Sequence, residues 1–390
     1  MLSGVQYVTG ILNKLVLSET EYLLDLSRIG LIWFSEDPDE FMPAANQLRL
    51  IQNRLRNPNM DFYFVYSSKC LSQQAMNDLE YFAKNNKLHL IDFDNALKQA
   101  KKTELDDDIF LIARQERSQT LKKKGGSLAA ASDTVRTLEC LLEICANYID
   151  CDVDFDFSQM PRFHLVKSPV IIPGRIRDFE DFKVPYLNNC FVGVAVTSKE
   201  DLRIHPKAKE KLNAVKKVIH QRYFQPTVET LLQEFTGAPT FTASDPAVSM
   251  FIQTLFSLSQ NNIFAYRRML STVAPYLREK LYKESVIKYS GPEAWAFLFN
   301  GTQNVTEETD LDELSEVFIE EIEKANELQN GLTDCFLYNI NPEQNIDGLP
   351  KSDLSWTPYG KTKMRARSQE IDRRLTTLQA HCRGHLVRNR

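Results

Sequence analysis

Ile29-Gly30-Leu31-Ile32-Trp33-Phe34 is a short continuous apolar run, which is typical of a buried parallel strand. Helical and strand patterns alternate after it. We expect a helix over residues 47–55, a strand at 61–66, a helix at 71–84 and a strand at 87–92. This alternation predicts an α/β fold with a doubly wound sheet. Ligands of such sheets bind beyond the carboxyl ends of the strands.

Polar and aromatic residues stand where strands are expected to end, at Trp33, Tyr66–Ser68, Asp92 and Asp150–Asp152. Asp150-Cys151-Asp152 follows an apolar helix expected over residues 130–146. Its two carboxylates offer hard oxygen ligands for Mn²⁺ or Mg²⁺. Asp133 and Arg136 lie one helical turn apart and share a face, which suits the hydroxyls and phosphates of a nucleotide-sugar. Glycosyl transfer is therefore the first hypothesis.

Other interpretations of this acidic stretch are open. Alternating acidic residues are common in a solvated strand edge or turn. Asp150, Asp152, Asp154 and Asp156 also resemble the opening of an EF-hand loop. That loop needs Gly at its sixth position and Glu at its twelfth, where this chain has Phe155 and Pro161. A calcium site of that type is disfavoured.

The composition is that of a soluble globular protein, with 390 residues, 43% hydrophobic and 25% charged. No apolar run reaches the length of a membrane span, and residues 1–7 lack the basic start and cleavage site of a secretory signal. The seven cysteines are odd in number and scattered, which favours reduced thiols in a cytosol over a zinc site.

Charge is distributed unevenly along the chain. Residues 361–390 contain nine Lys/Arg and two Asp/Glu, for a charge of +7. The other 360 residues carry 38 basic and 50 acidic side chains, for a charge of −12. A basic tail on an acidic body predicts a specific partner for the tail and disfavours general nucleic-acid binding.

The remaining elements follow from the same patterns. Further strands are expected at 164–172 and 190–197, an acidic amphipathic helix at 311–328 and a loop at 338–360. Between them, uninterrupted helical patterns predict an inserted subdomain, with helices at Ala208–Tyr223, Thr227–Phe235, Ala247–Leu258 and Ile263–Tyr282. The expected units are an N-terminal helical segment (1–28), a catalytic core (29–205), the helical insertion (206–282), the end of the core with a lid (283–360) and a basic helix (361–390).

The chain resembles the Asp-x-Asp glycosyltransferases of the large clostridial glucosylating toxin type and related bacterial effectors. The matching pieces occur in the family's order and span most of residues 30–356. They are Leu31-Ile32-Trp33, Ala131-Ser132-Asp133-x-x-Arg136, Tyr148-Ile149-Asp150-x-Asp152, Asn188-Asn189, Tyr289-Ser290-Gly291-Pro292 and Ser355-Trp356. The resemblance implies a GT-A-like, Rossmann-type sheet that binds a nucleotide-sugar.

The resemblance also implies roles for the donor-side residues. Trp33 would stack on the uracil base, with a core aromatic as the alternative. Asp133 and Arg136 would contact the donor sugar and its phosphates, and an ion pair between them is compatible with this. Asp150 would contact the ribose, the sugar and a metal-bound water. Asp152 would bind Mn²⁺ directly.

Residues near the C-terminus would complete the site by the same resemblance. Ser355 would reach the metal, and Trp356 would cover the β-phosphate as part of the catalytic set, closing the site against water. Asp353 is a further candidate metal ligand. Asn189 and Gly291-Pro292 would shape the sugar pocket, although Gly-Pro is also an ordinary turn.

The chain departs from the family before the Asp-x-Asp pair. Cys145-Ala146-Asn147 stands where members carry Gly-Gly, and Asn is a residue that tolerates the left-handed turn this requires. No second carboxylate stands at nucleophile spacing, so a covalent double displacement is not indicated. Retention of anomeric configuration is expected from the resemblance.

The C-terminal segment matches the IQ pattern of calmodulin-binding helices. Its matching residues are Leu378, Gln379, Arg383, Gly384 and Arg388. Apolar residues recur at helical spacing from Ile371 to Leu386, so residues 371–390 predict a helix for a calmodulin-like partner. Packing on the catalytic domain or on an anionic membrane is the alternative.

Together these features predict a retaining glycosyltransferase that uses UDP-glucose or UDP-GlcNAc with Mn²⁺ or Mg²⁺. We expect a bacterial effector, translocated into the host cell cytosol, that modifies a host protein hydroxyl and is bound or activated by calmodulin. The alternatives are transfer to a glycan or small molecule, and a catalytically silent scaffold that binds calmodulin.

Overall fold

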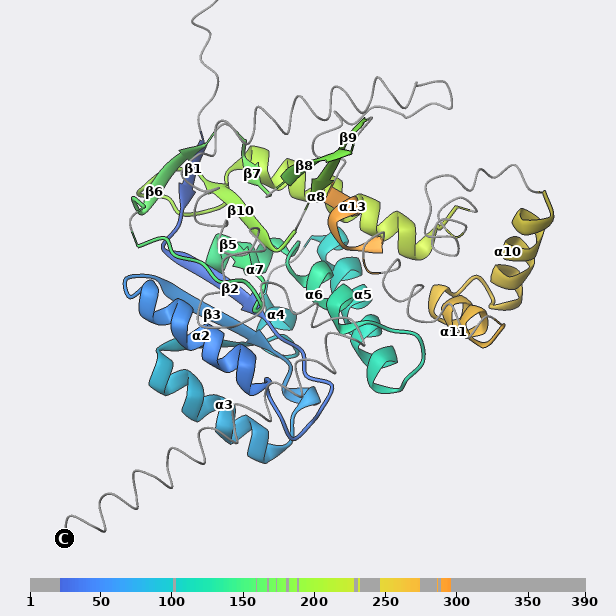
Figure 1. Ribbon diagram of the computed structural model, residues 1–390, viewed down its shortest axis with the longest axis horizontal. Helices are drawn as coiled ribbons and strands as arrows, with labels where there is room; N and C mark the ends of the chain where they lie inside the picture. Colours follow the sequence, from blue (N-terminus) through green and yellow to red (C-terminus); the bar gives the residue numbers. More distant parts are fainter. Residues whose placement is uncertain are drawn as a thin grey trace, which may run out of the picture.

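The computed structural model describes residues 22–100, 103–227 (apart from 159, 167, 173, 180–181 and 188), 231, 246–273, 286 and 289–295. Eight strands within this part form a mixed sheet in the order β4-β3-β2-β5-β10-β1-β6, with β7 paired to β10 (Figure 1). They are β1 (Tyr22–Asp25), β2 (Arg28–Ile32), β3 (Asp61–Tyr66), β4 (Leu88–Asp92), β5 (Asn147–Ile149), β6 (Phe163–Val166), β7 (Val170–Ile171) and β10 (Phe191–Val196).

One half of the sheet is parallel and is wound with helices. β4, β3, β2 and β5 run in the same direction, while β10, β1 and β6 continue the sheet antiparallel. The connecting helices are α2 (Ala44–Arg56), α3 (Gln73–Asn86), α4 (Ala96–Gln99), α5 (Glu104–Leu121), α6 (Leu128–Val135) and α7 (Glu139–Cys145). The α/β prediction and the strand–helix alternation over 29–92 are confirmed.

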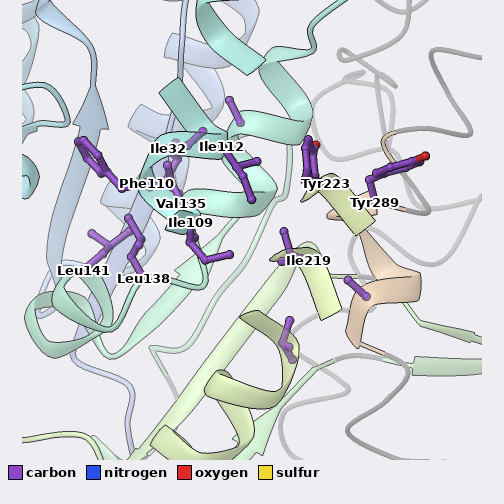
Figure 2. Packing of buried hydrophobic residues seen from close by; sticks show 14 of the residues in the cluster. Ile32, Ile109, Phe110, Ile112, Val135, Leu138, Leu141, Ile219, Tyr223 and Tyr289 are labelled. Atoms are coloured by element: carbon purple, nitrogen blue, oxygen red, sulfur yellow. The ribbon is translucent and has the colours of Figure 1, made fainter. Parts of the chain in front are cut away.

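Strand alternation divides the core into two layers. Ile32, Val65 and Ile91 project to the face that α5, α6, α7 and α8 (Pro206–Phe224) cover. Leu31 and Phe64 project to the opposite face, which α2 and α3 cover. Figure 2 shows the first layer, in which side chains of the sheet, α5, α6 and α8 pack together. This packing fixes the strand ends that face the candidate site.

Three helices are described in the region after residue 206 that was predicted to be helical. α8, α10 (Pro246–Leu258) and α11 (Ile263–Val273) fall on the expected segments, and α8 packs against α5 within the core. α10 and α11 lie far from the sheet in Figure 1. Within the described residues no helix combines the length and apolarity that a bilayer crossing requires. Residues 1–21, 311–328, 338–360 and the tail lie outside this part.

Several expected elements are wrong in kind or extent. Residues 22–25 form strand β1 rather than helix, because they pair with both β10 and β6. The helix expected over 130–146 is two helices that break at 136–138. The strand expected at 164–172 is divided into β6 and β7. A hairpin of β8 (Gly174–Phe179) and β9 (Phe182–Leu187) was not anticipated.

The buried face of α2 also differs from the expectation. A helix was predicted here, but the apolar Leu55 on it is 74% exposed. The residues that α2 buries include Asn46, Arg49 and Asn53, each at most 1% exposed. A buried polar helix face needs polar partners, and these are described below.

The turn before β5 places Ala146, not Asn147, in the left-handed region. Ala146 ends α7 with φ 54°, while Asn147 lies in β5 and its side-chain amide donates to the Asp25 carbonyl at 2.6 Å. A positive φ is costly for a residue with a Cβ. The backbone strain of this turn is therefore carried by Ala146.

Ala146→Gly is expected to raise the free energy of unfolding by about 1 kcal/mol, because glycine adopts this φ without strain. Chemical denaturation of the two proteins measures the difference. Ala129→Gly within α6 is the matched control, and it should destabilise by about the same amount because its backbone is helical. A destabilised Ala146→Gly would show that the turn is not strained.

Candidate functional site

The order of the strands reverses between β2 and β5, which is where a ligand crevice is expected. From β2 the chain winds outward through β3 and β4, then returns to β5 on the other side of β2. Such a reversal opens a crevice at the carboxyl ends of the two strands. Gly30 pairs with Tyr148, and continuing this register places Ile32 opposite Asp150. Trp33 and Asp150, both predicted as site residues, therefore flank the crevice.

Arg136 is the central cation of this region. Its Nη2 lies 2.9 Å from Asp133 Oδ1 and 2.9 Å from Asp150 Oδ1, and its Nη1 donates to the carbonyl of Asn189. The guanidinium also lies 4.2 Å from the ring centroid of Tyr148. Burial lowers the pKa of Arg136, but the neighbouring Asp150, Tyr148 and Asp133 outweigh it and hold the pKa above its usual value. Arg136 is a fixed positive charge.

Asp133 is enclosed beside this cation. Its Oδ1 accepts a hydrogen bond from the Asn189 side-chain amide at 3.0 Å. Burial, helped by the charge of Asp150, raises the pKa of Asp133 to about 7, although Arg136, Asn189 and Ser290 oppose the shift. The predicted pair of Asp133 and Arg136 on one helical face is confirmed, and the pair extends to Asp150.

Tyr148 and Ser132 support the carboxylate of Asp150. The Tyr148 hydroxyl donates to Asp150 Oδ1 at 2.5 Å and lies 3.3 Å from the Ser132 hydroxyl. Neither residue had a predicted role. The signal was present for Tyr148, because residues two apart in a strand share a face. Asp150 is thus oriented by a phenol on one side and a guanidinium on the other.

The pKa of Asp133 leads to a pH-dependent stability. A folded-state pKa of about 7 exceeds the unfolded value of about 4, so the folded protein holds this proton more tightly. The stabilisation that the proton provides is complete below pH about 4 and is lost as the pH rises through about 7. Asparagine has no carboxyl proton to lose, so the Asp133→Asn variant does not undergo this pH-dependent loss of stability. The Tm of Asp133→Asn minus that of the wild type is therefore expected to grow from pH 4 to pH 8.

Differential scanning calorimetry across this pH range measures that difference. Asp156→Asn is the control, because Asp156 lies outside the Asp133–Arg136–Asp150 group and its carboxylate accepts a local hydrogen bond from Ser158 N–H. A pH-independent difference for Asp133→Asn would show that Asp133 stays ionised throughout.

Trp33 is half-buried at the end of β2. Its backbone N–H continues the sheet by donating to Val65 O at 2.9 Å, and its ring packs against the layer that contains Leu31 and Phe64. The indole Nε1 is buried and has no hydrogen-bond partner among the described residues. A buried indole N–H normally finds a partner, so a ligand or water is expected to complete this position.

The acidic pair supplies two candidate cation ligands. Asp150 and Asp152 are both partly exposed, and the Asp150 side chain is 29% exposed. Within the described ranges, no group of three or more His, Cys, Asp or Glu side chains is arranged to hold a metal ion. The other predicted ligands, Asp353 and Ser355, lie outside the described residues, as does Trp356.

The predicted sugar-side residues fall into two positions. Asn189 is buried and bonded to both Asp133 and Arg136, as described above. Gly291 is buried and its N–H donates to Val286 O at 2.8 Å, while Pro292 begins α13 (Pro292–Trp295). Since Ser290 influences the pKa of Asp133, the Tyr289–Pro292 turn borders the same group.

The ends of β3 and β4 carry separate hydrogen-bond networks. The Ser68 hydroxyl donates to Asp92 at 2.7 Å, and Arg117 pairs with Asp94 at 2.6 Å. Burial raises the pKa of Asp94, but hydrogen bonds from Arg117 and Ser67 outweigh it and lower the pKa. Ser68 and Asp92 are at strand ends as predicted, and their side chains bond to each other.

Comparison with known proteins identifies the class of the N-terminal part. Residues 11–173 match the sequence model of glycosyltransferase family 88. No curated protein matches the chain at a significant level. The chain is a glycosyltransferase by this match, which includes Trp33, Asp133, Arg136, Asp150 and Asp152.

Solved structures show weak likeness to the same class. The chain is similar to the PaToxG glycosyltransferase with 15% identity and a TM-score of 0.41, covering 84% of this chain and 95% of that chain. It is also similar to the catalytic domain of alpha-toxin from Clostridium novyi, with 12% identity, a TM-score of 0.39 and 86% of each chain covered.

Proposed function

We propose that this protein is a retaining glycosyltransferase that uses UDP-glucose or UDP-GlcNAc with Mn²⁺ or Mg²⁺ to modify a hydroxyl of a host protein. One observation carries the proposal. In a glycosyltransferase domain, Asp133, Arg136 and Asp150 meet at the crevice where the strand order reverses, with Trp33 at the facing strand end. This is the position at which such sheets bind nucleotides.

The candidate metal ligands are compatible with a hard divalent cation. Asp150 and Asp152 offer carboxylate oxygens, the ligands that Mn²⁺ and Mg²⁺ prefer. Two carboxylates, Asp133 and Asp150, share the single guanidinium of Arg136, so their ionised forms leave net negative charge at the crevice. Asp353 and Ser355 are proposed as the remaining ligands. When bound, the cation would supply charge that stabilises a departing diphosphate.

Other side chains would bind the phosphate, the sugar and the base of the donor. Arg136, already fixed, would bind a donor phosphate without reorganisation. Asp133 would accept hydrogen bonds from sugar hydroxyls, and the Asn189 amide would donate hydrogen bonds to them. Both lie next to the Gly291-Pro292 turn. Trp33 would stack on the base. Residues Ser355 and Trp356 would close the site against water, which favours transfer over hydrolysis.

A panel of donor-hydrolysis reactions with the full chain tests the proposal. We expect release of UDP from UDP-glucose or UDP-GlcNAc with Mn²⁺ or Mg²⁺, and loss of this activity with EDTA. NMR of the sugar product is expected to show the anomer of the donor. No turnover of any UDP-sugar would reject the enzyme, and an inverted product would reject retention.

The basic tail supports a proposal about the partner. We propose that residues 371–390 bind calmodulin, with Leu378 and Gln379 on the apolar face and Arg383 and Arg388 meeting acidic residues. Calmodulin is a eukaryotic protein, so this binding would confine a bacterial effector's activity to the host cytosol.

Isothermal titration of the full chain with calmodulin, with and without Ca²⁺, tests the partner. Replacement of Leu378 and Arg383 by alanine is expected to abolish binding and to leave the thermal unfolding of the catalytic domain unchanged. Binding that is unaffected by these changes would reject the IQ assignment. Equal donor hydrolysis with and without calmodulin would remove the activating role.

A further inference from the structure

The polar face of α2 lies against the chain that follows the Asp-x-Asp pair. Its residues Asn46, Arg49, Asn53 and Asn57 recur at intervals of three or four, so they form one face of the helix and its C-terminal end. Each is at most 1% exposed. The segment 151–157 runs beside them without belonging to a strand of the sheet. Its Val153, Phe155 and Phe157 side chains are buried in the layer under α2.

Two asparagine side chains form hydrogen bonds with the backbone of this segment, in the way that a neighbouring β-strand would. Asn53 donates to Val153 O at 2.7 Å and accepts from Phe155 N–H at 3.2 Å. Asn57 donates to Phe155 O at 3.1 Å and accepts from Phe157 N–H at 2.7 Å. A side-chain amide has one donor and one acceptor face, like a peptide group. The helix therefore provides two successive peptide-like contacts.

The repeat distances of the two elements explain the match. Four residues of α-helix advance about 6 Å along the axis, and two residues of extended chain advance about 6.6 Å. Asn53 and Asn57 are four residues apart and serve carbonyls two residues apart, at Val153 and Phe155. Asn57 also donates to the Asn53 carbonyl at 2.8 Å, which fixes its amide group. We call Asn53 and Asn57 the amide ladder.

The amide ladder is one of several contacts that hold the acidic pair. Arg49 lies 3.6 Å from Asp154, and Asn46 donates to Cys151 O at 3.5 Å, the carbonyl between the two candidate cation ligands. On the other side, Asp150 N–H donates to Cys190 O at 2.8 Å, and Cys151 Sγ contacts Ile32 O at 3.6 Å. The chain around Asp150 and Asp152 is therefore fixed from both flanks.

We propose that the amide ladder is a positioning device that sets the placement of Asp152 relative to Asp150 for cation binding. The inference rests on the proposed function, because it gives Asn53 and Asn57 a role toward the cation of that site. Both asparagine side chains are buried against residues 153–157 and are not candidate cation ligands. They act by bonding the backbone that begins directly after Asp152, and removing a supporting contact of this kind typically weakens metal binding 10- to 100-fold.

Asn53→Leu is the main test, because leucine has a similar volume and makes no hydrogen bonds. Mn²⁺ binding to the full chain is measured by electron paramagnetic resonance, with hydrogen exchange of residues 153–157 recorded in parallel. We expect the Kd for Mn²⁺ to rise about tenfold and the amides of Phe155 and Phe157 to lose protection. Ile219→Ala, a buried change in the other core layer, is the control for general loss of stability.

The outcomes separate the inference from the function on which it rests. If Asn53→Leu and Ile219→Ala bind Mn²⁺ as the wild type does, the ladder has a structural role only and the inference is rejected. If the wild type binds no Mn²⁺ and hydrolyses no UDP-sugar, the proposed function is rejected first. If Asn53→Leu does not fold, Asn57→Ala at the end of α2 replaces it, with an unchanged Kd again rejecting the inference.

Discussion

Asp152→Asn is expected to reduce cation-dependent hydrolysis of the donor about a thousandfold, which corresponds to about 4 kcal/mol of transition-state stabilisation. The change keeps the size of the side chain and removes one negative charge. Asp152 is partly exposed at the crevice, so its loss should not unfold the protein. Steady-state release of UDP with Mn²⁺, together with the Tm of each protein, measures both effects.

Asp156→Asn is the matched control for this change. It lies four residues further along the same segment and accepts a hydrogen bond from Ser158 N–H at 2.9 Å. Its activity should stay within a factor of two or so of the wild type, in line with the small effects of surface substitutions. Retained activity in Asp152→Asn, or an equal loss in Asp156→Asn, would contradict the assignment of Asp152 as a cation ligand.

Arg136→Met is expected to cost about 3–5 kcal/mol of stability and to abolish donor binding. Methionine fills much of the arginine volume but leaves Asp133 and Asp150 without their shared cation, and breaking a buried ion pair by removing one partner is strongly destabilising. The expected fall in Tm is about 10 °C. Calorimetry and titration with UDP measure the two consequences.

Arg203→Met tests whether burial is the cause. Arg203 also pairs with an aspartate, Asp201, at 2.6 Å, but its side chain is 78% exposed. Exposed pairs contribute little to stability. We therefore expect no measurable change in Tm or in UDP binding for Arg203→Met. A similar loss in both variants, or none in Arg136→Met, would show that the Asp133–Arg136–Asp150 group does not support the site.

Sequence patterns were sufficient where local periodicity and tertiary structure agree. β2, β3 and β4 are short apolar or alternating runs. β3 and β4 lie within one residue of their predicted bounds, and β2 ends two residues before its predicted end. The helical spacing of Asp133 and Arg136 predicted their ion pair. Since the ends of parallel strands share one edge of a sheet, these elements predicted where the candidate site would lie.

The parts that could not be predicted depend on partners distant in the sequence. β1 is a strand because β10 and β6 pair with it from both sides, which no local pattern in Tyr22–Asp25 reveals. The buried polar face of α2 makes sense only once Val153 and Phe155 lie against it. Asn147 was expected to permit the turn before β5, whereas Ala146 takes the positive φ.

A crystal structure of the full chain with UDP and Mn²⁺ tests the assignment of the crevice most directly. We predict the uracil ring against Trp33, the diphosphate beside Arg136, and an anomalous Mn²⁺ peak within bonding distance of an Asp152 oxygen, about 2.1–2.2 Å. Nucleotide bound away from the carboxyl ends of β2 and β5, or a Mn²⁺ peak with no contact to Asp150 or Asp152, would contradict it.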